Sequence, residues 1–394
     1  MNELTQNRRY DLDWLRVIAF AILIWFHAAI IFIPGGLPLI QNGETSAMLD
    51  WFVAISHQFR LALLFLVSGC GVAYARRRRV GLTFVRERSV RLLVPLVFGI
   101  FVLVPPMVYL EKLHIGSVNV GFDEFYPAFF TEGIYPVGNL SWHHLWFIAY
   151  LYLFCMLGLF WFERLSNLDG RWRNELTRYG RGGGIFLLII PLSVVEIALR
   201  AAFPGFRDLI HDWASFLHWF LIFVAGYVIA TDQRVLANIA ARIWQSCGLA
   251  MTSGIVLFTV FYDDGFHLDL NEDWVVMKYL ALCIVRMTFV WSVLLLCIGL
   301  AGRYLCHGGR VLRYLNEAVY PCFLLHLTVI VALGYWVTPW NLTIVWKYNI
   351  VTWGTVVVVL LVHHWLICPF DTMRFLFGLK PQARNVNDVA DVSS

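Results

Sequence analysis

The chain has 394 residues, of which 60% are hydrophobic and only 14% are charged, and its mean hydropathy is +0.69. A soluble domain carries about 25% charged residues, so this composition excludes an ordinary soluble protein and predicts one that spans a lipid bilayer. The formal net charge is only +4, and the basic residues lie in short segments between apolar runs, which excludes a strongly basic nucleic-acid-binding protein.

Apolar runs that are long enough to cross a bilayer occur at about ten places along the chain. A transmembrane helix needs about 20 mostly apolar residues. In chain order the predicted spans are 12–34, 46–75, 90–110, 143–163, 184–203, 213–231, 242–263, 274–301, 318–338 and 344–367. The chain is therefore predicted to be an all-α, polytopic membrane bundle over residues 1–380, followed by a disordered cytosolic tail over 381–394.

The distribution of positive charge predicts the orientation of the bundle. With the N-terminus in the cytosol, most Lys and Arg residues fall in cytosolic segments, as the positive-inside rule requires, and both termini are then cytosolic. The segment 111–142 would lie outside, and it is long and rich in aromatic residues. We expect it to cover an outward-facing site; the alternative is an aromatic belt at the membrane interface.

The first span carries ionisable residues, which are costly inside a bilayer and therefore indicate function. Arg16 and His27 are eleven residues apart, close to three helical turns, so their side chains share a face on which Asp13 also lies. His27 is expected about 16 Å beyond Arg16 along the helix axis. An imidazole at that depth is suited to removing a proton from a hydroxyl group. The alternative is a buried histidine that hydrogen-bonds a neighbouring helix.

The second span contains a similar arrangement. His57 and Arg60 share one helix face, and Ser68 lies eleven residues after His57. Because Arg60 is near the middle of the membrane, its side chain must face the bundle interior or a wet cavity. We expect it to neutralise a thioester or a phosphate-bearing group; the alternative is an ion pair with a carboxylate such as Glu196.

Seven arginines follow the second span in one short cytosolic segment: Arg76, Arg77, Arg78, Arg79, Arg86, Arg88 and Arg91. Planar guanidinium groups suit phosphates, and a donor such as coenzyme A carries phosphates on its nucleotide end. The segment is predicted to bind such a donor. For any single arginine, the competing interpretation is topogenic charge or contact with lipid headgroups.

Polar residues also lie close to two later span boundaries. His144 and Trp146 open the fourth span, and Glu317 precedes the ninth span, which contains His326. Each histidine alone is more typical of a structural role than of a catalytic one. The eight cysteines show no C-x-x-C spacing, so neither a disulfide framework nor a metal site is expected.

Taken in order, these motifs resemble those of the membrane acyltransferase-3 family. The spacing from Arg16 to His27 is similar to Arg-x10-His in that family's opening helix. Cys70 departs from the family pattern, because an aromatic residue usually follows Ser-Gly there. The other matching segments are F-L-V-S-G at 65–69, the arginine segment with L-L-V-P at 86–95, H-L-W-F at 144–147 and L-H at 325–326. The resemblance covers about residues 9–370.

The resemblance implies an enzyme of the bacterial cytoplasmic membrane. It would transfer an acyl group from cytosolic acyl-CoA to a hydroxyl of an extracytoplasmic carbohydrate, without a permanently bound cofactor. Two segments, H-Q-F-R-L-A-L-L-F-L-V-S-G and W-H-H-L-W-F, are most similar to a branch associated with adding succinyl groups to periplasmic glucans. His27 would be the general base, assisted by Arg16 and Asp13. Substrate contacts are expected from His57, Arg60, Ser68, His144, Trp146, Glu317 and His326.

Two other functions fit the same composition. A transporter or flippase for a lipid-linked sugar or a small anion would also use buried Arg and His residues, as a proton relay. Against this, the sequence shows no inverted repeat and no matched pair of Gly- or Pro-broken helices. A membrane scaffold or sensor is the third possibility, and it predicts intramembrane charges that are paired and dry.

Overall fold

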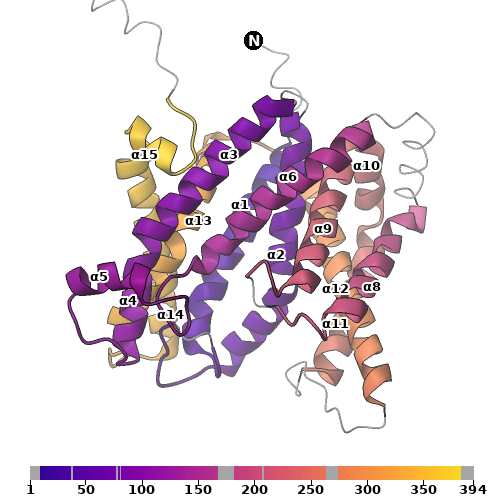
Figure 1. Cartoon of the computed structure of the whole chain (residues 1–394). Coiled ribbons are helices and arrows are strands. Elements are labelled where there is room, and N and C mark those ends of the chain that lie inside the picture. Colours follow the sequence, from indigo (N-terminus) through magenta and orange to yellow (C-terminus); the bar gives the residue numbers. More distant parts are fainter. Residues whose placement is uncertain are drawn as a thin grey trace, which may run out of the picture.

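The computed structural model describes residues 9–36, 39–76, 79, 81–166, 182–205, 208–262 and 274–382. In these ranges the chain is a bundle of helices without strands, and a single isolated bridge joins Ile134 to Leu140 (Figure 1). The predicted all-α class is therefore confirmed. The first residues of α1 and the last helix, α15, lie at the same end of the bundle (Figure 1).

Every predicted span coincides with an apolar helix. The helices are α1 (Tyr10–Ala29), α2 (Ala47–Arg76), α3 (Gly81–Phe98), α4 (Val104–His114), α6 (Trp146–Ser166), α8 (Ile189–Leu199), α9 (Trp213–Thr231), α11 (Ile243–Val260), α12 (Val275–Tyr304), α13 (Arg310–Val337) and α14 (Ile344–Val362). A π-helical turn, Gly99–Leu103, joins α3 to α4 into one long helix. Three shorter helices are α5 (Phe122–Thr131), α10 (Gln233–Ala241) and α15 (Asp371–Leu376).

Nine helices in the described part of the chain are long and apolar enough to cross a membrane. The remaining predicted span, 143–163, corresponds to α6, whose apolar stretch within that part, His143–Leu159, is shorter. The protein is thus an integral, multi-pass membrane protein. Because each span is helical, its backbone N–H and C=O groups are hydrogen-bonded within the span. The hydrocarbon core of a bilayer requires this, since it offers no water as a partner.

Two helices begin earlier than the hydropathy pattern predicts. The third span was expected from residue 90, but α3 already begins at Gly81; the ninth was expected from 318, but α13 begins at Arg310. In both cases the added turns carry arginines. A hydropathy window detects only the apolar part of a helix, whereas the helix itself continues beyond the apolar layer.

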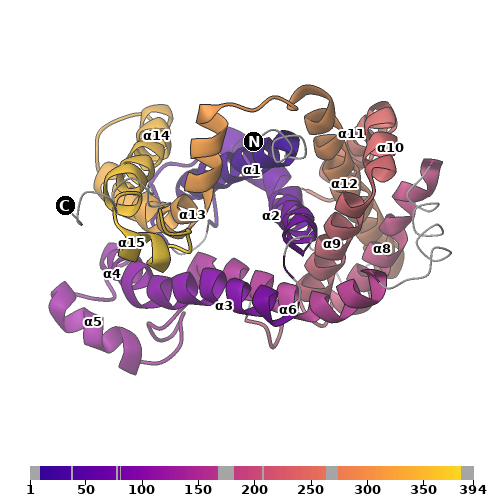
Figure 2. The same cartoon turned by 90° about the horizontal axis from the view of Figure 1, so that it is seen from above.

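Helix α1 lies in the interior of the bundle and packs against α2, α12, α13 and α14. Viewed from above, α3 and α6 run along one side, across from α1, α2 and α13 (Figure 2). Helices α8 to α12 form a separate group beside α2 (Figure 2). The predicted catalytic helix is therefore surrounded by protein on several sides, and its polar face is turned away from lipid.

The closest helix contact brings α2 against α9, and it depends on two glycines. A Cβ atom on Gly69 would overlap the backbone carbonyl of Phe223, and one on Gly226 would overlap that of Leu66. Small residues allow such close approach of helix backbones in membrane bundles. The glycine of the F-L-V-S-G motif thus faces α9, and its neighbour Ser68, about 100° around the helix, lines a cavity described below.

Candidate active site

Two adjoining cavities lie along the polar face of α1. The first, here called the His27 cavity, has a volume of about 260 Å³. Its walls come from α1, α2, α6 and α13 and from the loop before α6. The lining residues are Leu23, His27, Leu39, Arg60, Leu61, Tyr135, Ser141, Trp142, His143, His144, Trp146, Phe147, Phe323 and Leu327.

The second cavity, here called the Arg16 cavity, has a volume of about 570 Å³ and lies toward the beginning of α1. Its polar lining residues are Arg16, Ser68, Arg88, Arg91, Asn316, Glu317, Tyr320, Arg374 and Lys380. Five of these side chains are cationic and one is a carboxylate, so the cavity favours an anion of high charge density.

His27 is held by a second histidine, and the hydrogen bonds define which ring nitrogens carry protons. Nδ1 of His326 lies 2.6 Å from the backbone carbonyl oxygen of Phe323, which can only accept, so this nitrogen donates. Nε2 of neutral His326 is then an acceptor, and it lies 3.1 Å from Nδ1 of His27. His27 therefore donates from Nδ1, and its lone pair is on Nε2.

Both histidines are packed against aromatic rings that fix their orientation. The ring of His326 is fully buried and does not line either cavity. It contacts His27, with ring centroids 5.1 Å apart, and Phe20 edge-on at 5.7 Å. His326 was predicted to contact substrate; the structure places it behind His27 instead, where it positions the imidazole that lines the cavity.

Arg60 lies on the wall of the His27 cavity and is 3% exposed. Its guanidinium carbon is 3.2 Å from the centre of the Phe26 ring, a close cation–π contact. The alternative partner, Glu196, instead accepts two bonds from Arg200, at 2.8 and 2.7 Å. Glu196 and Arg200 are one helical turn apart, which allows this local pair.

The loop before α6 forms part of the wall of the His27 cavity. Tyr135, Ser141 and His143 line it, so the segment 111–142, which was expected to cover a site, contributes Tyr135 and Ser141 to this wall. The Tyr135 hydroxyl donates to the Glu111 carboxylate at 2.7 Å. Burial, together with this bond, raises the pKa of Tyr135, so its hydroxyl keeps its proton.

His144 is a further residue of the cavity wall. Its Nε2 lies 3.1 Å from the carbonyl oxygen of Leu324 and therefore donates, which leaves the lone pair on Nδ1. This Nδ1 is buried and makes no hydrogen bond to another protein group. A buried acceptor without a partner is costly, so a hydroxyl from a bound molecule would satisfy it. Trp146 lines the same cavity.

Arg16 lines its cavity and donates to the side-chain oxygen of Asn316 at 3.0 Å. Asp13 lies 3.9 Å from the same guanidinium nitrogen, but it does not line the cavity. Glu317 lines the cavity and forms an ion pair with Arg374 at 2.8 Å. The predicted stripe of Asp13, Arg16 and His27 therefore divides between the two cavities, with His27 in one and Arg16 in the other.

The seven arginines between residues 76 and 91 do not behave as one group. Arg88 and Arg91 line the Arg16 cavity. Arg76 is buried against the Phe84 and Phe162 rings, Arg79 pairs with Glu87, and Arg86 is exposed. Arg77 and Arg78 lie outside the described residues. Among the five described arginines of this segment, Arg88 and Arg91 on α3 are therefore the two positioned to contact a molecule in this cavity.

His57 is another sequence-predicted site residue that lies outside both cavities. It is exposed and lines neither cavity, whereas Arg60, one turn later, is buried. Both side chains are arranged around the Phe26 ring, with the His57 ring centroid 6.0 Å from it. His57 and Arg60 do share one helix face, but only part of that face forms the cavity wall.

Four polar residues of the Arg16 cavity were not among the site residues predicted from the sequence. Asn316 and Tyr320 lie on the early turns of α13, and Arg374 and Lys380 come from α15 and the chain just after it. Arg374 donates to the carbonyl of Lys380, and Arg91 donates to that of Gly378 at 3.2 Å. For Arg374 and Lys380, the only signal in the sequence was their positive charge after the final span, which the positive-inside rule already explains.

Fold and site together define a class of protein. It is a multi-pass helical membrane protein in which a histidine-lined cavity lies next to an arginine-lined one. The family model described as an acyltransferase domain matches residues 9–364, nearly the whole chain. The chain therefore belongs to the acyltransferase-3 family, and it is a membrane acyltransferase.

Curated relatives extend this similarity along the full length. The chain is 22% identical to glucans biosynthesis protein C from Escherichia coli O139:H28 (strain E24377A / ETEC). It is 23% identical to the protein of that name from Escherichia coli (strain K12). Each alignment spans 405 residues and covers 99% of both chains. No solved structure matches the chain.

Proposed function

We propose that the protein transfers an acyl group from acyl-CoA to a hydroxyl of a carbohydrate on the other side of the bacterial cytoplasmic membrane. The name of the Escherichia coli relative refers to glucan biosynthesis, so the acceptor that we propose is a periplasmic glucan. The acyl group that we propose is acetyl or succinyl. The observation that carries the proposal is the position of His27, an imidazole of defined tautomer on the wall of a cavity deep in the bundle.

The Arg16 cavity supports the donor half of the proposal. Coenzyme A carries phosphates at one end and a thioester at the other, so its charged end matches a cavity lined by five cationic side chains. Arg88 and Arg91 from α3, with Arg374 and Lys380 from the chain around α15, would hold these phosphates. The positive-inside rule places this end of the bundle in the cytosol, where acyl-CoA is present.

The His27 cavity supports the acceptor half. The acceptor hydroxyl would donate its proton to Nε2 of His27 while its oxygen attacks the thioester carbonyl carbon. The carbon–sulfur bond then breaks, and the thiolate takes the proton from the His27 imidazolium. The products are an ester and free coenzyme A, so atoms and charge balance. Arg60, buried on the cavity wall, would stabilise the oxyanion that forms at the carbonyl.

His144 provides a second contact for the acceptor. Its Nδ1 lone pair is buried, has no protein donor and belongs to a residue on the cavity wall. A neighbouring sugar hydroxyl would satisfy it and so orient the attacking group.

The test measures release of coenzyme A thiol and formation of acylated glucan by purified protein in detergent. With acetyl-CoA or succinyl-CoA and a purified periplasmic glucan, we expect an ester whose mass identifies the acyl group. His27→Ala is expected to lose transfer by about 10²- to 10⁴-fold, the usual contribution of a general base. Intact thioester together with glucan movement across proteoliposomes would instead identify a transporter.

A further inference from the structure

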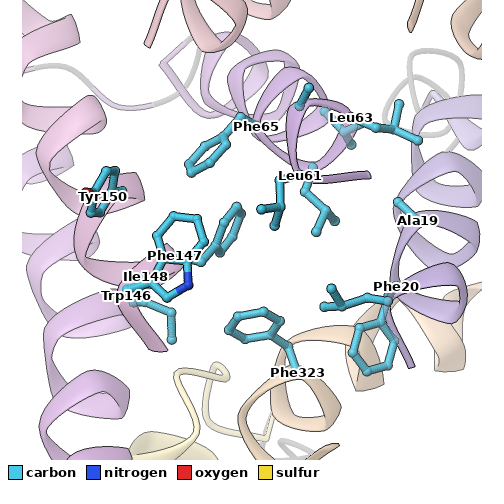
Figure 3. Packing of buried hydrophobic residues seen from close by; sticks show 14 of the residues in the cluster. Ala19, Phe20, Leu61, Leu63, Phe65, Trp146, Phe147, Ile148, Tyr150 and Phe323 are labelled. Atoms are coloured by element: carbon cyan, nitrogen blue, oxygen red, sulfur yellow. The ribbon is translucent and has the colours of Figure 1, made fainter. Parts of the chain in front are cut away.

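Two phenylalanines separate the His27 cavity from the Arg16 cavity. Among the described residues, Phe147 on α6 and Phe323 on α13 are the two that line both cavities. Their ring centroids are 5.5 Å apart, and the side chains are almost completely buried. We call this pair the septum. Figure 3 shows the ring of Phe323 between Phe147 and Phe20.

The septum is about one helical turn thick. On α1, Leu23 lines the His27 cavity and Phe20, one turn earlier, lines the Arg16 cavity. On α2, Leu61 and Leu64 divide in the same way. One turn of helix is about 5.4 Å, so the cavities lie end to end, with only the two rings and their immediate neighbours between them.

The rings of the septum are supported differently on their two sides. Phe147 packs against Phe65 on α2, with centroids 4.5 Å apart. Phe323 packs against the imidazoles of His144 and His326, at 5.7 and 5.6 Å. The septum therefore directly borders His144 and His326, and it lies between the Arg16 cavity and the cavity that His27 lines.

We propose that the septum determines the size of the acyl group that the enzyme accepts. This inference rests on the proposed function, because it assumes that the thioester enters from the Arg16 cavity. The two rings must separate to let the acyl group pass to His27. Because interiors are close-packed, a short acyl group requires little movement of the rings and a long one requires much more.

The experiment compares acetyl-CoA with hexanoyl-CoA, using purified protein in detergent and a purified periplasmic glucan. Each variant is characterised by kcat/KM for both thioesters, and the ratio of the two values is the readout. Phe147→Ala and Phe323→Ala are expected to raise the hexanoyl-to-acetyl ratio at least tenfold. Phe147→Trp is expected to lower it, because a larger ring narrows the passage.

Phe154 provides the matched control. It lies two turns after Phe147 on the same helix, is fully buried against Phe65 and lines neither cavity. Phe154→Ala removes the same ring from the same core and should leave the ratio unchanged. Phe147→Leu and Phe323→Leu, which keep most of the core volume, should raise the ratio in the same direction if an alanine variant fails to fold.

The outcomes separate this inference from the proposed function. The role of the septum in acyl-group selection is overturned if the ratio is unchanged in all septum variants, or if it changes equally in Phe154→Ala. The proposed function still stands in that case if the wild-type protein transfers the acyl group of acetyl-CoA. Absence of transfer by the wild-type protein from acetyl-CoA, succinyl-CoA and hexanoyl-CoA overturns both. The backbone carbonyl of Phe323, which binds His326, is present in every variant. Weakening of that bond would lower kcat/KM for both thioesters, so it would not by itself change their ratio.

Discussion

The hydrogen bond between His326 and His27 gives the most direct test of the proposed mechanism. When His27 takes a proton, its Nδ1–H becomes a charged donor to Nε2 of His326, 3.1 Å away. A hydrogen bond to a charged group contributes about 1.5–3 kcal/mol, compared with about 1 kcal/mol for a neutral one. Replacing His326 by Phe removes this acceptor while keeping an aromatic ring of similar shape.

The expected loss follows from this energy. The neutral bond of about 1 kcal/mol is already present before the reaction, so protonation of His27 adds about 0.5–2 kcal/mol. At 1.36 kcal/mol for each tenfold change in rate, this difference corresponds to a fall in kcat of about 2- to 30-fold for His326→Phe. His326→Gln places an amide near the position of Nε2 and can still accept from His27, so it should recover most of the rate. His27→Ala removes the base itself and should lose more than either variant.

The assay measures kcat and KM for thiol release at saturating glucan. Because His326 lines neither cavity, KM for acyl-CoA should change by less than about twofold, and the effect should appear in kcat. Equal activity of the Phe and Gln variants would refute the role of His326 as the hydrogen-bond acceptor for protonated His27. So would a raised KM with unchanged kcat, since that pattern would assign His326 to substrate binding.

Three further predictions concern the donor site and the packing of the bundle. Arg91→Gln should raise KM for acyl-CoA about tenfold or more, because a charge-assisted contact is lost. The matched change at exposed Arg86, Arg86→Gln, should alter this KM little, and initial rates over a range of acyl-CoA concentrations check both. Arg374→Gln should also raise this KM, and an unchanged value would remove the chain around α15 from the donor site. Gly69→Val should destabilise the protein by at least about 1–3 kcal/mol, because its Cβ overlaps the Phe223 carbonyl; a thermal melt in detergent that matches wild type would refute this close contact.

The spans and the polar face of α1 were predictable from sequence because both depend on local regularities. Apolar length identifies a spanning helix, and helical periodicity places residues eleven apart on one face. Arg16 and His27 accordingly both face cavities. The same periodicity placed His57 with Arg60, yet only Arg60 reaches a cavity, because a helix face is wider than a cavity wall.

The remaining residues of the site could not be predicted because they depend on which helices become neighbours. Asn316 reaches Arg16 only because α13 packs against α1, and their positions in sequence are about 300 residues apart. Arg374 and Lys380 join the Arg16 cavity because the chain around α15 folds back onto α3 and α13. Periodicity identifies the face of a helix but not the helix that covers it.

The arrangement of the two cavities explains how a donor with several phosphates would serve a reaction deep in a bilayer. Moving ionised groups into hydrocarbon is costly, so the phosphates must stay at the cationic end of the bundle. Arg16 and His27 are separated by about 16 Å along α1 at 1.5 Å per residue. Only the uncharged arm and the thioester would then cross the septum between Phe147 and Phe323. A donor that carries its phosphates next to the acyl group, such as an acyl phosphate, could not meet both requirements at once, and the protein should not use it.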